Sequence, residues 1–132
     1  MVVRHHEIDF AAGALVFPGG KVDQSDYDKE LNQYLCEEES SDRDNIHFKI
    51  AAIRECFEEA NVLFAKNKNG REIITEDELL KLKKWRDAFV NDSTSMYEFA
   101  SLENLLFSID SLIPSSHWIT PEKVPKRFDT RF

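Results

Sequence analysis

The sequence predicts an α/β (α+β) fold in a single domain of 132 residues, because one short strand signal is followed by three helix signals. Residues 14–17 are an apolar run that ends at the Pro-Gly-Gly of residues 18–20, which is typical of a buried strand that stops at a turn. An amphipathic pattern over residues 50–64 indicates one helix, and capping boxes at residues 75–78 and 95–98 indicate two more. A chain of this length can bury a core of its own.

A strongly acidic stretch follows the predicted turn. Between residues 26 and 46 there are eight acids and two bases, a net charge of −6. Its first part, residues 27–36, is typical of a short helix with Leu31, Tyr34 and Leu35 facing inward, and residues 37–45 are typical of a solvated loop.

The next helix carries three carboxylates at helical spacing i, i+3 and i+4: Glu55, Glu58 and Glu59. At about 100° per residue these side chains share one arc of the helix. Apolar residues occupy the opposite arc, namely Ile50, Ile53, Cys56, Phe57, Ala60, Leu63 and Phe64. Charged runs are usually the wet face of a helix, but a hard cation such as Mg²⁺ or Mn²⁺ would also hold such a cluster together. The helix alone leaves both interpretations open.

The later helices form a predicted helical segment over residues 75–113. The box that starts at Thr75 opens a helix to about Val90, and the box that starts at Ser95 opens the next. The second helix is expected to run until Pro114. Its apolar stripe consists of Phe99, Leu102, Leu105, Leu106, Ile109 and Leu112. We expect this stripe to pack in the core; left exposed, it would favour a homo-oligomer.

Together, the Pro-Gly-Gly turn and the run Arg-Glu-Cys-Phe-Glu-Glu of residues 54–59 resemble the Nudix hydrolases, whose signature is G-x5-E-x7-R-E-U-x-E-E-x-G-U with U aliphatic. Thirty-three residues separate Gly20 from Arg54, against thirteen in the signature, so residues 21–46 contain an insertion of twenty. The first signature Glu has no clear counterpart, because counting forward gives Asp26 and counting back gives Ile46. Asn61 replaces the last signature Gly, and we expect it to end the helix in the left-handed region.

Within that family the chain resembles the branch of coenzyme A diphosphatases with a long insertion in the Nudix box. The resemblance rests on the W-x-T-P of residues 118–121 and the R-F-D-T-R-F of residues 127–132. It implies a mixed sheet between helices, with the helical segment added to it. It also implies that residues 1–132 are one partial Nudix domain, and that a further acidic residue lies beyond them.

The resemblance implies a metal site on the carboxylate helix. Glu55, Glu58 and Glu59, with a main-chain carbonyl from Gly19 in the turn, would bind Mg²⁺ or Mn²⁺, and Glu58 or Glu59 would be the principal ligand. Arg54 is placed to orient the carboxylates through i, i+4 pairing. Glu58, Glu59 and Arg54 are therefore the predicted catalytic residues.

A diphosphate substrate needs cations, and Arg4, Arg127 and Arg131 are the candidates. The expected reaction is hydrolysis of a diphosphate linkage in a nucleoside diphosphate derivative, with coenzyme A or an acyl derivative as the first candidate. The alternatives are NADH, ADP-ribose or dinucleoside polyphosphates as substrates, or a non-catalytic Nudix-like module that serves a partner.

Composition limits the other partners. A net charge of −8 argues against nucleic acid or an anionic membrane as an electrostatic partner. The spacing of Cys36 and Cys56 suggests neither a disulfide framework nor zinc, Cys56 is expected to be buried, and the four histidines are expected to be surface or satisfied polar residues. We expect an intracellular, cytoplasmic protein, or an organellar one if it is eukaryotic.

Overall fold

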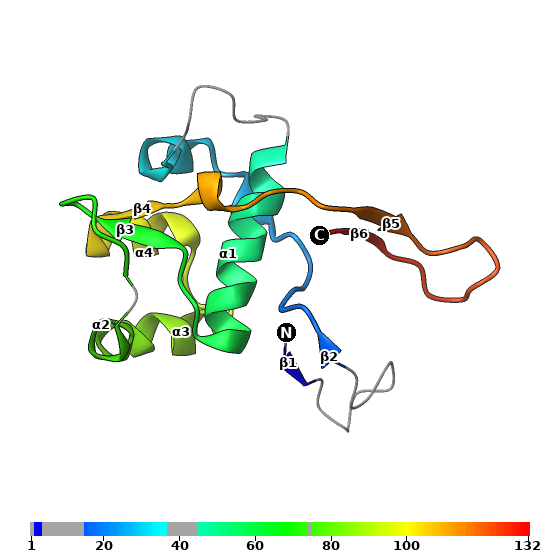
Figure 1. The fold of residues 1–132 in the computed structure, drawn as a ribbon, viewed down its shortest axis with the longest axis horizontal. Helices are drawn as coiled ribbons and strands as arrows, with labels where there is room; N and C mark the ends of the chain where they lie inside the picture. The colour runs from blue at the N-terminus through cyan, green and yellow to red at the C-terminus, as the bar shows by residue number, and fades with distance from the viewer. Residues whose placement is uncertain (1, 4–14, 37–44, 74) are drawn as a thin grey trace.

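The computed structural model describes residues 2–3, 15–36, 45–73 and 75–132 of the chain (Figure 1). Arg4 and nearly all of the expected loop over residues 37–45 lie outside these ranges. None of the helices in the described ranges is both long enough and apolar enough to cross a bilayer.

A central helix, α1 (Ile46–Ala60), organises the molecule. Three further helices and a pair of strands lie on one side of it, whereas a hairpin projects on the other side (Figure 1). The first group is α2 (Glu76–Lys81), α3 (Lys83–Val90), α4 (Met96–Glu103), β3 (Ala65–Asn67) and β4 (Leu105–Phe107). The hairpin is β5 (His117–Ile119) and β6 (Asp129–Arg131).

The described strands form three separate antiparallel pairs. The first is β1 (Val2–Val3) with β2 (Leu15–Val16), and the others are β3 with β4 and β5 with β6. Strand β2 lies within the apolar run predicted as a strand. Each strand is only two or three residues long, so each pair contributes few backbone hydrogen bonds. Of the three pairs, β3–β4 packs against a helix, since β4 contacts α4.

The core lies between α1 and the three later helices, as the apolar stripe of α1 predicts. Phe57 of α1 is fully buried and stacks on Phe99 of α4, with ring centroids 5.4 Å apart. Phe89 of α3 meets both rings edge-on. This aromatic cluster fixes one face of α1 and leaves the opposite face, which carries the carboxylates, free to meet the Pro-Gly-Gly turn.

The acidic stretch is tied to this core at its start. Two short 3₁₀ helices, η1 (Gln24–Tyr27) and η2 (Lys29–Tyr34), replace the single short helix expected there. Leu31 is fully buried, and Tyr34 and Leu35 are half-buried against the core, so the predicted inward face is confirmed.

Both capping boxes are confirmed, but both predicted helices end earlier than expected. The first breaks at Leu82 into α2 and α3. The second ends at Glu103, because Asn104 adopts the left-handed conformation with φ 53°. Leu105 and Ile109 are still buried, now from β4 and a 3₁₀ turn, whereas Leu102 is 69 % exposed.

Candidate functional site

Helix α1 ends where the sequence predicts. Asn61 adopts the left-handed conformation with φ 53°, and its N–H donates to the carbonyls of Cys56 and Phe57. The N–H of Val62 also donates to the Cys56 carbonyl, at 3.2 Å. These bonds close the final turn of the helix. The position of Glu58 and Glu59 is therefore set by a defined helix terminus.

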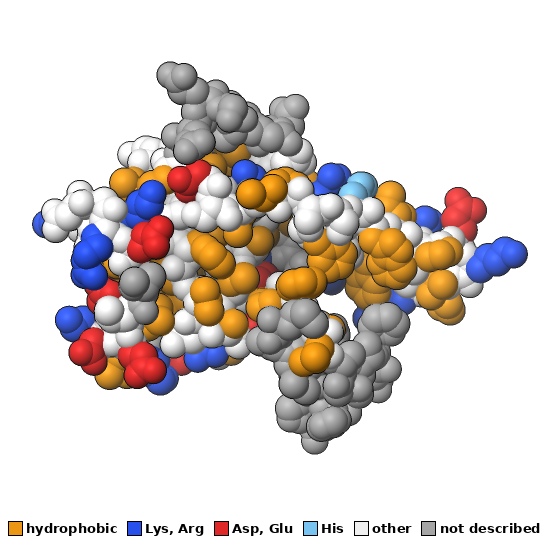
Figure 2. Space-filling view, viewed as in Figure 1, with side chains coloured by type: hydrophobic (Ala, Val, Ile, Leu, Met, Phe, Trp, Pro, Cys, Tyr) orange, Lys and Arg blue, Asp and Glu red, His pale blue; other side chains and the backbone are white. Residues whose placement is uncertain are grey.

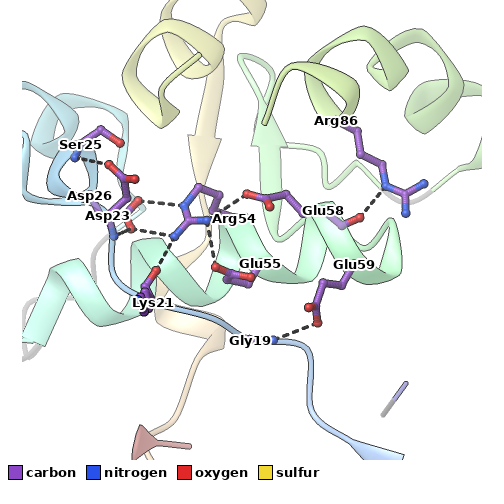
Figure 3. Close-up of polar contacts among 10 residues, drawn as sticks. All are labelled: Gly19, Lys21, Asp23, Ser25, Asp26, Arg54, Glu55, Glu58, Glu59 and Arg86. Atoms are coloured by element: carbon purple, nitrogen blue, oxygen red, sulfur yellow. Dashed lines mark hydrogen bonds and ion pairs between the residues drawn. The ribbon is translucent and has the colours of Figure 1, made fainter. Parts of the chain in front are cut away.

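Arg54 lies at the centre of the polar contacts on this face (Figure 3). Its Nη1 donates to Glu55 and to Glu58, at 2.9 Å in each case, so the predicted i, i+4 pair is present. On its other edge, Nε and Nη2 donate to the two carboxylate oxygens of Asp26, at 3.3 and 3.1 Å. Nη2 also donates to the carbonyl of Lys21, at 2.9 Å. One guanidinium thus joins the insertion to two of the three glutamates.

The two residues reached by counting through the signature, Asp26 and Ile46, differ in their contacts. Asp26, the residue reached by counting forward from Gly20, has a side chain with no exposed surface and forms a forked ion pair with Arg54. It also accepts a hydrogen bond from the N–H of Asp23, within a capping box of η1. Ile46 is simply the first residue of α1. Asp26 is a site residue to which the sequence analysis gave no role, although the G-x5 spacing pointed to it.

The electrostatics of the face follow from these contacts. Burial alone would lower the pKa of the Arg54 guanidinium, but Asp26, Glu58 and Glu55 outweigh it and raise that pKa above its ordinary value. Burial raises the pKa of the Glu55 carboxyl, and repulsion from Glu58 and Glu59 adds to this against the attraction of Arg54. Glu55 therefore carries its charge at a cost that one guanidinium does not fully offset.

The Pro-Gly-Gly turn packs directly on the carboxylates. The N–H of Gly19 donates to Glu59 Oε2, at 3.1 Å. A Cβ added to Gly20 would lie 2.3 Å from Glu55 Oε1, so only a glycine leaves room for that carboxylate as it stands. The contact recorded for Gly19 is made by its N–H, whereas the metal-ligand hypothesis uses its carbonyl. That hypothesis stays a prediction.

The donor set fits a hard divalent cation in its chemistry, since it consists of carboxylate oxygens on one helix face. In the described ranges, however, no three His, Cys, Asp or Glu side chains converge as a metal cluster. The carboxylates have other partners: Arg54 joins Glu55 to Glu58, and Gly19 holds Glu59. Metal binding would require at least some of these contacts to rearrange.

The predicted substrate arginines lie elsewhere. Arg127 and Arg131 belong to the projecting hairpin (Figure 1). Arg127 Nε donates to the carbonyl of Thr120 within the hairpin, at 3.1 Å, and the Arg131 guanidinium lies 4.4 Å from the ring centroid of Phe48 in the first half of α1. Neither of these contacts connects an arginine to the carboxylate cluster. Arg4 lies outside the described ranges.

Helix α3 also contacts the acidic end of α1. Arg86 of α3 donates from Nε to the main-chain carbonyl of Glu58, at 2.8 Å (Figure 3). This contact spans 28 residues, and no local sequence signal reveals it.

Cys56 is half-buried rather than buried, because it lies at the boundary between the apolar and acidic faces. Burial raises the pKa of its thiol, and the neighbouring Glu59 and Glu55 add to the effect.

Known proteins similar to this chain agree with the signature. Nudix hydrolase 7 of Caenorhabditis elegans is 33 % identical over 132 residues, which is all of this chain and 37 % of that protein. Acyl-coenzyme A diphosphatase NUDT19 of Xenopus laevis is 24 % identical over an alignment of 171 residues, which covers all of this chain and 45 % of that protein. The chain thus spans less than half the length of either relative.

A solved structure and a family model extend the comparison. The crystal structure of a Nudix hydrolase from Alicyclobacillus acidocaldarius matches with a TM-score of 0.67 and 29 % identity, over 98 % of this chain and 57 % of that one. This match confirms the predicted fold class. The family model of the NUDT19 Nudix domain matches residues 37–132, most of the chain and nearly all of its helical and hairpin elements. The chain therefore belongs to the NUDT19 Nudix domain family.

Proposed function

We propose that this chain supplies the metal-binding part of a diphosphatase that hydrolyses a nucleoside diphosphate derivative, with coenzyme A or acyl-coenzyme A as the first candidate substrate. The carboxylate face of α1 is the single observation that carries the proposal, because three acids share it and the Pro-Gly-Gly turn packs against it. The choice of substrate is supported by the Xenopus laevis relative, which is an acyl-coenzyme A diphosphatase.

In this proposal Glu55, Glu58 and Glu59 hold Mg²⁺ or Mn²⁺. Such a cation would neutralise charge on a bound diphosphate and lower the pKa of an attacking water. A cation at this face would also offset the mutual repulsion of the three carboxylates. Arg54 acts on the carboxylates rather than on the substrate, because each of its three nitrogens already donates to the protein.

Arg127 and Arg131 remain proposed substrate contacts. Both are exposed, as a phosphate-binding side chain must be before substrate arrives. The Arg131 guanidinium lies over the Phe48 ring, with its Cζ 4.4 Å from the ring centroid. The N–H groups on the edges of a guanidinium are the part that binds phosphate oxygens.

A second candidate function is a non-catalytic module, and the contacts of Arg54 favour it. A guanidinium that already bridges Glu55 and Glu58 offsets part of the negative charge of the cluster without a metal. The two proposals differ in one measurable property, which is saturable binding of a divalent cation by α1.

The first test is a calorimetric titration with Mn²⁺ of the wild-type chain and of Glu59→Gln. We expect saturable binding by the wild type and an affinity at least about tenfold lower for the variant. Glu76→Gln is the matched control, because Glu76 is an exposed acid in the first turn of α2. Absence of saturable binding by the wild type would support the non-catalytic module.

The second test is chromatography of the products that the natural full-length polypeptide forms from coenzyme A and Mg²⁺. Release of phosphopantetheine and adenosine 3′,5′-bisphosphate would support the first-choice substrate. Cleavage of ADP-ribose, NADH or a dinucleoside polyphosphate, with coenzyme A left intact, would keep the reaction class and change the substrate.

A further inference from the structure

The end of α1 needs a hydrogen-bond donor that its own backbone does not supply. The last carbonyls of a helix lack intrahelical partners. Those of Cys56 and Phe57 accept from the N–H groups of Val62 and Asn61. The Glu58 carbonyl receives no backbone hydrogen bond among those recorded in the described ranges. Its recorded donor is Arg86 Nε, at 2.8 Å.

Arg86 is held in place by the core. It lies on α3 four residues after Leu82, the N-cap residue of that helix, and three residues before Phe89, so its side chain and that of Phe89 share one face of the helix. Leu82 is 7 % exposed and Phe89 4 % exposed, and the Phe89 ring meets Phe57 of α1 edge-on at 6.3 Å. The Arg86 guanidinium therefore reaches α1 from a fixed base, and its own side chain is half-buried.

The contact is electrostatically favourable as well as geometrically specific. The carbonyl end of a helix carries partial negative charge, which a cation in the last turn stabilises. Glu58 and Glu59 add two formal charges to the same turn, so the contribution of a cation there is larger than at an ordinary helix end. Figure 3 shows Arg86 approaching the Glu58 carbonyl from α3, with the Glu58 carboxylate directed toward Arg54.

We infer that Arg86 is a positioning residue for the acidic end of α1. It fixes the peptide group that joins Glu58 to Glu59, and so sets the direction in which the Glu59 carboxylate leaves the helix. Glu58 has a second anchor in Arg54, whereas the recorded contact of the Glu59 side chain is with Gly19. Loss of Arg86 should therefore disturb Glu59 more than Glu58. The helical segment α2–α4 thereby acts on the carboxylate site through one guanidinium.

This inference rests on the proposed metal site, and its test separates the two. Mn²⁺ affinity is measured by calorimetry for the wild type, Arg86→Ala, Arg86→Lys and the control Lys83→Ala. Lys83 lies on the same helix but pairs with Asp87 at an exposed position, 2.7 Å away. Circular dichroism and the amide NMR resonances of residues 58–62 are recorded for each variant, at a temperature where all are folded.

We expect Arg86→Ala to bind Mn²⁺ about tenfold more weakly, the lower end of the range for residues that orient metal ligands. Arg86→Lys should recover affinity to within about threefold of the wild type, because an ammonium also donates to a carbonyl. Lys83→Ala should bind like the wild type. In Arg86→Ala the amide resonance of Glu59 should shift more than that of any residue in the first half of α1.

If the wild type binds Mn²⁺ and Arg86→Ala binds it with the same affinity, the inference is overturned and the proposed function stands. Absence of Mn²⁺ binding by the wild type would overturn the proposed function and, with it, this inference. A loss of affinity that Arg86→Lys fails to restore, accompanied by loss of helix signal, would mean that Arg86 acts only on folding. That result would also overturn the positioning role.

Discussion

Replacement of Gly20 by alanine perturbs the carboxylate face through one added methyl group. The new Cβ would lie 2.3 Å from Glu55 Oε1, 2.7 Å from its Cδ and 2.8 Å from Oε2. Ordinary contact begins at 3.4 Å, so the carboxylate must retreat by about 1 Å, the difference between 3.4 and 2.3 Å. That movement breaks the 2.9 Å hydrogen bond from Arg54 Nη1 as it stands.

The change should affect the site far more than it affects folding. Gly20 does not use the left-handed region, so alanine fits the backbone. Alanine also reduces the entropy of the unfolded chain, which stabilises the fold by about 0.4–1 kcal/mol. The Glu55 side chain is flexible and can move out of the way. A displacement of about 1 Å in a carboxylate that is proposed to bind a metal, by contrast, can cost about tenfold to a hundredfold in function.

The assay compares Gly20→Ala with Gly19→Ala. A Cβ at Gly19 would meet no atom within 4 Å, so it serves as a matched control in the same turn. We expect Mn²⁺ affinity to fall about tenfold in Gly20→Ala and to stay unchanged in Gly19→Ala, with the urea unfolding free energies of both variants within about 1 kcal/mol of the wild type. Wild-type affinity in Gly20→Ala would refute the reasoning. A loss of stability above about 2 kcal/mol would refute it too, because it would mean that the added methyl group clashes with the backbone and not with the flexible Glu55 side chain.

Two predictions concern stability. Asp26→Asn leaves the buried Arg54 guanidinium without its forked partner. Because Arg54 keeps other acceptors, we expect the free energy of unfolding, measured by urea denaturation, to fall by about 3 kcal/mol, the low end for a broken buried pair. A loss below about 1 kcal/mol would show that the pair is not essential. Burial raises the pKa of Glu103, but hydrogen bonds from the Trp85 indole and a neighbouring lysine outweigh it and hold that pKa below its ordinary value. Its ionised form therefore stabilises the fold above about pH 4.5, and this contribution disappears as the pH falls through the lowered pKa. Glu103→Gln should be slightly less stable than the wild type at pH 7 and equally stable near pH 2; a difference that does not change with pH would contradict the assignment.

The parts of the fold that could be predicted are those encoded by neighbouring residues. The capping boxes at Thr75 and Ser95 and the left-handed Asn61 each follow from a few adjacent side chains, and the structure contains all three. The carboxylate face of α1 was visible for the same reason, since its spacing is that of a single helix turn.

The parts that could not be predicted depend on contacts between distant residues. The apolar stripe continued past Asn104 with helical spacing, yet Leu105 and Ile109 are buried from a strand and a 3₁₀ turn, because side-chain burial alone does not identify the backbone that produces it. The G-x5 spacing points to Asp26, but it does not reveal that Asp26 pairs with Arg54, 28 residues further along the chain. The contact of Arg86 with α1 joins two helices and has no local signal.

The projecting hairpin of β5 and β6 has a consequence for local stability. None of the core residues identified in the described ranges comes from residues 113–132, and Trp118 and Ile119 are 55 % and 52 % exposed. Figure 2 shows apolar side chains on the surface of the projecting hairpin. A two-stranded hairpin that buries little apolar surface is only marginally stable in water. This one contacts α1 through Arg131, which lies over Phe48, and it should open without unfolding that helix. Its amide hydrogens should exchange with solvent much faster than those of the helix. If Arg127 or Arg131 binds a phosphate, the ligand would then order the hairpin. The free-energy cost of ordering it would lower the observed affinity.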